Sequence, residues 1–450
     1  MSTALDSVEF YAAQFDRLVP ALQTTEPEWV TRTRRNAVQS FRQLGFPTTR
    51  DEEWRFTNVR PIAETEFELA AGPSDPWDTS VLEPYRLPAS PAELVFVNGE
   101  YSPGLSRLEA APTGVSAGSL RTALASRPRD VEPYLAQVAD FVRQGFTALN
   151  TAFWSDGAFV RVAPGTAVTA PIHVMFVTTK SRGKAAGEAN GGPPAAHPRV
   201  LIVAGDDSQA SIVESYIAAA AGLYLTNAIT EAILGDHAMV EHYKVQSESK
   251  RSYHIATLAA IAAAHATFTS HSADTGGALV RNTVTAVLDG EGAECTLNGL
   301  YIVDGDRLVD NHTVIDHARP HCNSRELYKG ILADRARGIF NGKIVVRPDA
   351  QKTDAKQTNK ALLLSQDAQI NTKPQLEIFA NDVKCTHGAA VGQLDEDALF
   401  YLRARGLPLT DARRLLVQAF AGEVLDRMTL APLRARMEAE LLQRLAAAGG

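Results

Sequence analysis

Residues 199–245 read RVLIVAGDDSQASIVESYIAAAAGLYLTNAITEAILGDHAMVEHYKV, and this stretch decides the fold class. Short apolar or alternating runs follow one another in it, and turn residues such as Gly235-Asp236 separate them. Such a succession is typical of short β-strands joined by short turns. The pattern begins near residue 158, includes LVRNTVTAVL (279–288), and continues for more than 200 residues without a convincing long helix. The sequence therefore predicts a β-rich core.

The length of this core favours a solenoid over a sandwich or a barrel. Single sandwiches and barrels usually end near 250 residues or below. The strand–turn units recur loosely and are apolar on one face, which is typical of turns that stack on one another. No fixed repeat word is visible. The expected fold class is mainly β, a β-helix-like solenoid with helical ends.

The chain divides into three predicted domains. Residues 1–158 form a mostly helical N-terminal domain, in which VEPYLAQVADFVRQGFTALNTAFW (131–154) is one amphipathic helix. Residues 159–394 form the β-helix core, and SRGKAAGEANGGPPAAHPR (181–199) within it predicts a mobile surface loop. Residues 395–450 are helical, and they either cap the solenoid or offer a docking surface.

Composition excludes several classes of protein. The formal net charge of −8 argues against non-specific nucleic-acid binding, which needs a basic surface. Three Cys in 450 residues form no disulfide framework, so reduced thiols in the cytoplasm are the simpler interpretation. The start, MSTALDSVEF, lacks the regions of a signal peptide, and the most apolar run (255–264) is shorter than the roughly 20 residues of a bilayer span. We expect a cytoplasmic protein that binds neither membrane nor nucleic acid.

The stretch Asn341–Gly406 carries the candidate chemistry. Residues two apart in a strand share a face, so Val383, Cys385 and His387 would place a thiol beside an imidazole. Both groups bind transition metals and iron–sulfur species. The alternative is a buried free Cys next to a hydrogen-bonded His, and spacing alone leaves that alternative open.

A second group of thiol and imidazole side chains lies upstream. His317, His321 and Cys322 fall within six positions. A zinc site would need a partner set at finger-like spacing, and the chain has no Cys-x-x-Cys. Hydrogen bonding within a solenoid turn or at a subunit interface is favoured, and the roles of these residues and of Cys295 stay open. No P-loop motif occurs, so the chain is not itself a P-loop ATPase.

Several long segments of the sequence resemble those of a known family. They are AQKTDAKQTNKALLLS (350–365), TKPQLEIFANDVKCTHGAAVG (372–392) and LFYLRARG (399–406), and the resemblance continues upstream over 298–344. DEEWRFTNVRPI (51–62) carries it more loosely into the N-terminal third. The chain resembles the SufB/SufD family, the scaffold proteins of iron–sulfur cluster assembly.

Within this family the resemblance is to the SufD type. SufB-type chains carry a cysteine in the strand region where this chain has Asn359, and no Cys lies between 323 and 384. The resemblance implies a right-handed parallel β-helix and a scaffold, not an enzyme. It implies pairing with a SufB-like chain and binding of a SufC-like ABC-type ATPase through the helical tail.

The resemblance also implies what the site holds. A nascent iron–sulfur cluster, or iron, would be held transiently at the paired interface, with His387 as a ligand or iron-entry residue and Cys385 close by. Three points stay open: a flavin in the assembled complex, a homodimer when the partner is absent, and whether the cluster belongs to this chain or to its partner.

Two surfaces are expected to bind these partners. The stretch 376–383 is apolar, β-prone and free of Pro after Pro374, which suits strand addition along an open edge. The expected partner-binding residues are Leu376, Ile378 and Val383 in this stretch, and Leu399, Tyr401, Arg403, Arg405, Leu415, Leu416 and Phe420 in the helical tail.

The sequence leaves two other functions possible. A β-solenoid enzyme that acts on polysaccharide needs clustered acidic residues in a groove. The acids that could serve lie near turns, which weakens this alternative; they are Asp304, Asp306, Asp310 and Asp316. A purely structural solenoid is the third possibility.

Overall fold

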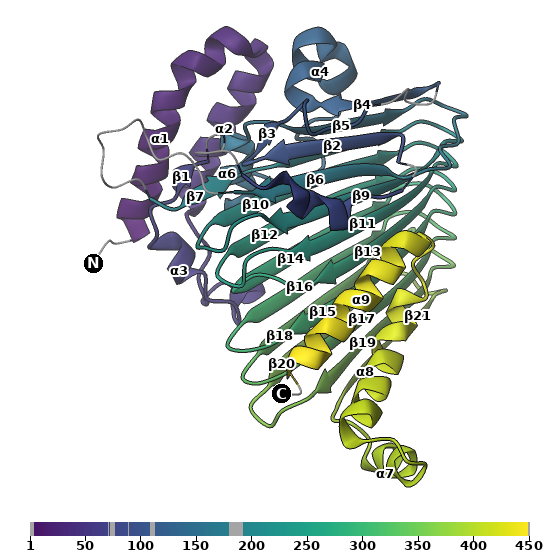
Figure 1. Cartoon of the computed structure of the whole chain (residues 1–450). Coiled ribbons are helices and arrows are strands. Elements are labelled where there is room, and N and C mark those ends of the chain that lie inside the picture. Colours follow the sequence, from purple (N-terminus) through teal and green to yellow (C-terminus); the bar gives the residue numbers. More distant parts are fainter. Residues whose placement is uncertain are drawn as a thin grey trace.

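The computed structural model describes residues 4–70, 72, 77–88, 90–108, 113–179 and 192–448. At its centre is a β-solenoid of two facing sheets, and through most of it the chain passes from one sheet to the other with each strand (Figure 1). The named strands pair in parallel except for β2 with β3 and β4 with β5 near the first turns. Helices occupy both ends of the chain. The predicted mainly β fold, with a parallel β-helix core and helical ends, is confirmed.

The first sheet has eleven strands and the second has ten. The first contains β1 (Glu68–Leu69), β4 (Val115–Ser119), β5 (Gly157–Val162), β7 (Pro194–Ala196), β8 (Arg199–Ala204), β10 (Leu225–Leu234), β12 (Tyr253–Ala262), β14 (Leu279–Leu288), β16 (Leu308–His317), β18 (Arg337–Val346) and β20 (Gln369–Ile378). The second contains β2 (Ala92–Val97), β3 (Glu100–Tyr101), β6 (Ile172–Thr178), β9 (Gln209–Ala218), β11 (Met239–Ser247), β13 (Thr267–Asp274), β15 (Glu294–Val303), β17 (Asn323–Leu332), β19 (Asp354–Leu363) and β21 (Lys384–Gly392).

Equivalent positions of successive turns stack in columns along the solenoid. From β8 onward the step from one turn to the next varies from 26 residues (Tyr253 to Leu279) to 32 (Arg337 to Gln369), and the first step is longer, with 42 residues from Gly157 to Arg199. This variation explains why the sequence shows no repeat of fixed length. Because side chains alternate between the two faces of a strand, every second column points into the space between the sheets.

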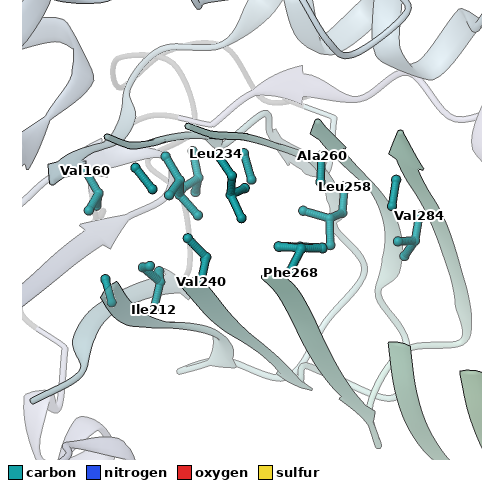
Figure 2. Close-up of a cluster of buried hydrophobic side chains, with 14 of the residues drawn as sticks. Val160, Ile212, Leu234, Val240, Leu258, Ala260, Phe268 and Val284 are labelled. Carbon is teal, nitrogen blue, oxygen red and sulfur yellow. The ribbon is translucent and has the colours of Figure 1, made fainter. Parts of the chain in front are cut away.

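Apolar side chains fill most of the space between the sheets. Figure 2 shows Val160, Leu234, Leu258, Ala260 and Val284 from the first sheet, with Ile212, Val240 and Phe268 from the second. Burial of such columns supplies the driving force that holds the two sheets together.

Charged and polar pairs also lie inside the solenoid, where the strand pattern predicted an apolar face. Lys244 Nζ lies 2.9 Å from Asp274 Oδ1, and His242 Nε2 lies 3.0 Å from Glu214 Oε1. All four side chains are buried. Burial of a charge is costly unless it is paired, so each pair requires the alignment that brings its partners together.

Most of the N-terminal helices cover the outer face of the first sheet (Figure 1). They are α1 (Ala4–Thr25), α2 (Glu28–Leu44), η1 (Glu52–Trp54), α3 (Arg60–Ala63), α4 (Leu120–Ser126), α5 (Pro128–Val131) and α6 (Gly145–Phe153). The helix η2 (Thr79–Tyr85) packs on the outer face of the second sheet instead, where Leu82 is buried with Val95 and Met175. Tyr11 of α1, Phe41 of α2 and Phe146 of α6 share one buried cluster with outward side chains such as Leu279 of β14.

The long amphipathic helix predicted over 131–154 is wrong in its first part. Only residues 145–153 are helical within it after α5 ends at Val131. The backbone N–H groups of Ala136, Val138 and Ala139 donate to the buried Glu231 carboxylate instead of to helical carbonyls. A tertiary contact therefore overrides the local periodicity.

Two C-terminal helices, α8 (Leu409–Leu425) and α9 (Ala431–Ala448), pack on the outer face of the second sheet. The helix α7 (Glu396–Ala404) contacts α8 and extends beyond the last turn of the solenoid (Figure 1). Val417 and Leu441 are buried against sheet residues such as Leu300 and Leu327.

The loop predicted over 181–199 lies outside the described residues as far as 191. For the end of this stretch the prediction of a surface loop is wrong. Residues 194–196 form strand β7, and Arg199, which is buried beside Glu231, begins β8. Among the described helices, none is both long and apolar enough to cross a membrane.

Candidate functional site at the open end of the solenoid

The last turn of the solenoid leaves two strand edges open. Within the described chain β20 pairs only with β18, and β21 pairs only with β19. The Phe379 N–H, which follows β20, donates inward to the Val346 carbonyl at 2.9 Å. Because backbone groups of successive strand residues point to opposite sides, the N–H groups of Thr372, Leu376 and Ile378 point outward.

The alternating direction of the N–H groups explains why β20 tolerates a proline, and it also holds in β21. Pro374 has the outward parity, so the N–H that it lacks would face the open edge, where proline is tolerated. The Lys384 N–H donates inward to the Thr353 carbonyl at 2.8 Å. The backbone N–H groups of Cys385 and His387 therefore point to the open edge. The two edges together offer a row of unpaired donors and acceptors.

The side chains of Cys385 and His387 continue two interior columns of the solenoid. Cys385 is aligned with Ala355 and His387 with Gln357, and both of these β19 residues are buried. The thiol and the imidazole therefore share one face, as their spacing predicted. They lie at the end of the interior, where the described part of the chain adds no further turn over them.

The two groups differ in burial. Cys385 and Val383 are partly buried against a small cluster that includes Ile344 and Ala355. Burial raises the pKa of the Cys385 thiol, so the thiol form is favoured in the free chain. His387 is exposed and makes no hydrogen bond to any described residue. The alternative of a fully buried Cys beside a hydrogen-bonded His does not fit this geometry.

Apolar side chains flank the open edges. Ile378 is 39% exposed, Phe379 63% and Val391 49%. Of these, the sequence singled out only Ile378; Leu376, also predicted, is half-buried. Phe379 and Val391 were missed, because a strand pattern does not show which strand is the last one in a sheet. Exposed apolar side chains along open strand edges are typical of an interaction site.

The helical tail presents only part of the predicted partner surface. Tyr401, Arg403, Arg405 and Leu415 are exposed, and Arg405 stacks on the Tyr401 ring at 4.2 Å. Phe400, which the sequence did not single out, is 74% exposed.

Three other tail residues were predicted at this surface. Leu399 is buried within the chain, so its placement on a partner surface is wrong. Leu416 is half-buried, and the Phe420 ring packs against Lys329 of β17. Phe420 contributes to the attachment of the tail, because α8 packs on the sheet through the face that carries Val417 and Phe420.

The other Cys and His residues do not converge on a ligand set. His317 Nε2 lies 2.9 Å from Ser324 Oγ, and burial lowers the pKa of His317 to about 4. Cys295 and Cys322 are buried, and burial raises the pKa of both thiols. His321 is exposed on a turn. Within the described chain no three His, Cys, Asp or Glu residues are grouped as a metal site. The contact of His317 with Ser324 is a hydrogen bond of the kind expected within a solenoid turn.

The acids considered for a polysaccharide-cleaving enzyme are each paired with a cation. Arg307 lies 2.8 Å from Asp304, Arg335 2.6 Å from Asp306, Arg281 2.5 Å from Asp310, and Arg347 2.7 Å from Asp316. Glycoside hydrolysis uses two carboxyl groups that face one another across the substrate. These four carboxylates each have their own partner and form no such pair.

Comparison with known proteins agrees with this architecture. The model of the SufBD core domain of the SUF system for iron–sulfur cluster assembly matches residues 185–420, and the model of the SufBD N-terminal region matches residues 6–174.

Three curated relatives span nearly the whole chain. An iron–sulfur cluster assembly SufBD family protein of Synechocystis is 35% identical and covers 92% of this chain and 90% of its own length. The iron–sulfur cluster assembly protein SufD of Escherichia coli is 32% identical over 91% of both chains. That of Bacillus subtilis is 26% identical over 90% of this chain and 91% of its own length. Together with the solenoid and its open end, these matches show that the chain belongs to the SufBD family of iron–sulfur cluster assembly proteins.

Proposed function

We propose that this chain is a scaffold that pairs through its open solenoid end with a SufB-like chain and holds a nascent iron–sulfur cluster at the seam between them. The observation that carries the proposal is the position of Cys385 and His387 at the mouth of the interior, beside two unpaired strand edges. The cluster is the cargo of the assembly, and it is bound and released.

The open edges suit a partner that itself ends in β-strands. β20 and β21 lie in different sheets, so a second solenoid end could pair with both edges at once and extend the columns across the seam. Ile378, Phe379 and Val391 would be buried there, which adds apolar burial to the backbone hydrogen bonds.

Ligand chemistry at this seam follows from the two side chains. A neutral imidazole offers one lone pair to iron, and the Cys385 thiol must lose its proton before it can bind. Because burial raises the pKa of this thiol, binding of iron would release a proton, and protonation would favour transfer of the cluster onward. Ligands from the partner would complete the coordination.

The helical tail is the proposed docking surface for an ABC-type ATPase. Phe400 and Leu415 are exposed, whereas α8 is attached to the solenoid by Lys329, whose Nζ lies 2.5 Å from Glu423. Only a few residues separate the end of β21 at Gly392 from the start of α7. Movement of α7 would therefore act directly on the strand that carries His387.

The experiment that tests the scaffold role is anaerobic cluster assembly on the complex of this chain with its SufB-like and ATPase partners. We expect His387→Ala to abolish cluster formation while pairing and thermal stability stay unchanged. His321→Asn is the matched control, because His321 is an exposed histidine on a solenoid turn, and Asn tolerates the positive φ of 60° found there. Full cluster formation on the His387→Ala complex would refute the assignment.

A further inference from the structure

A polar column leads from inside the solenoid to the candidate site. Strand register aligns Glu326 of β17, Gln357 of β19 and His387 of β21. Gln357 Nε2 donates to Glu326 Oε2 at 2.7 Å, and both side chains are buried. The column thus begins at a buried carboxyl group and ends at the exposed imidazole.

The carboxyl group decides which way the Gln357 amide is turned. Burial raises the pKa of Glu326 to about 7, so an alkaline pH favours the carboxylate. A carboxylate can only accept, hence the amide nitrogen must face it. Gly342 on the facing sheet makes room for this arrangement, since a Cβ at that position would lie 2.2 Å from Gln357 Nε2.

The amide oxygen is left without a partner. Gln357 Oε1 is buried and has no hydrogen-bond donor among the residues that the structure describes. A buried acceptor of this kind is costly and requires an explanation. With the nitrogen turned to Glu326 in the preceding turn, the oxygen is available to the last turn, where His387 is the aligned residue.

We propose that Gln357 is a positioning residue for His387. When the exposed imidazole turns inward along the column, its Nδ1–H donates to Gln357 Oε1, and Glu326 holds the amide in the orientation that makes this possible. The imidazole then keeps its Nε2 lone pair directed at the seam. Metal-binding histidines commonly donate their other ring N–H to an oxygen acceptor, which sets both the tautomer and the ring orientation. The proposal rests on the proposed role of His387 as a ligand.

The first test reads the tautomer of His387 and does not depend on that role. The full chain, labelled with ¹⁵N in histidine only, is measured by two-bond N–H correlation NMR at pH 8, and His387→Ala identifies the signal. We expect the Nδ1–H tautomer in the wild type and the Nε2–H tautomer in Gln357→Met, which keeps the size of the side chain but removes the acceptor. Lys356→Met is the matched control, because Lys356 is exposed on the opposite face of the same strand.

The second test uses anaerobic cluster assembly on the complex. Loss of an outer partner of a metal ligand commonly costs 10- to 100-fold, so we expect Gln357→Met to lower the initial rate of cluster formation by at least tenfold with pairing unchanged. Any of three results would overturn the inference. They are an Nε2–H tautomer in the wild type, an unchanged tautomer in Gln357→Met, and an unchanged rate of cluster formation in that variant. Full activity of His387→Ala would refute the scaffold site itself, which is a separate outcome.

Discussion

Replacement of Ile378 by proline tests the proposed seam without disturbing the fold. The inward N–H of Phe379 donates to β18, so the N–H of Ile378 points to the open edge and has no role in the ladder inside the chain. Pro374 has the same parity in the same strand, which shows that β20 accommodates proline at such positions. The variant therefore removes one outward donor and leaves the intrachain hydrogen bonds in place.

The expected effect can be worked out from the donors at the edge. In β20 and β21 the outward N–H groups belong to Ile370, Thr372, Leu376, Ile378, Cys385, His387, Ala389 and Val391. Each hydrogen bond contributes about 0.5–1.5 kcal/mol, and the proline ring also keeps the partner strand from approaching. A total loss of about 1–3 kcal/mol would weaken pairing with the SufB-like chain by roughly 5- to 150-fold.

Sedimentation equilibrium of the two chains at several concentrations measures this loss. Ile378→Ala is the control for the side chain, because it shortens the side chain and keeps the donor. Glu377→Pro is the control for the direction of the N–H group, because the Glu377 N–H points inward to β18. This variant should therefore lower the melting temperature of the free chain. Normal pairing of Ile378→Pro would show that the seam does not run along β20.

Three further predictions concern the tail and the buried charges. Phe400→Ser should weaken binding of the ATPase, measured by isothermal titration, and leave the melting temperature unchanged, because Phe400 is 74% exposed; equal affinity would exclude this surface. Asp274→Leu leaves the buried Lys244 ammonium without its paired carboxylate, so it should lower the free energy of unfolding, measured with urea, by about 3–5 kcal/mol. A decrease below about 1 kcal/mol would contradict the buried pair. Burial opposes ionisation of Asp310, but the contacts with Arg281, His312 and Thr57 together outweigh it, and the pKa of Asp310 falls from 3.8 to about 2. This lowered pKa contributes about 2 kcal/mol of stability that is present above pH 4 and lost as the pH falls from about 4 to 2, so the difference in stability between the wild type and Asp310→Asn should narrow over that range.

The structure also changes how the tail should be probed. Deletion of residues 410–450 would uncover the outer face of the second sheet, where Leu300 and Leu327 are buried by α8 and α9. Loss of ATPase binding in such a truncation would not distinguish a missing docking surface from a damaged solenoid. Substitution of an exposed side chain such as Phe400 avoids this ambiguity.

The sequence alone determined the features that depend on neighbours along the chain. Short apolar runs with turn residues between them predicted the strands, and the two-residue spacing of Cys385 and His387 placed both side chains on one face. The long sequence segments around these residues identified the family. These signals are local, because a strand, a turn and a shared face each arise from a few consecutive residues.

Only the tertiary structure decided which residues meet across the turns. The alignment of Glu326, Gln357 and His387 depends on turns of unequal length, which no local pattern records. The failed helix before α6 depends on Glu231, which lies far along the chain. Open edges exist only where stacking stops, so the exposed position of His387 follows from β21 being the last strand of its sheet. Local patterns specify the strands, whereas register and position in the stack come from contacts between distant residues.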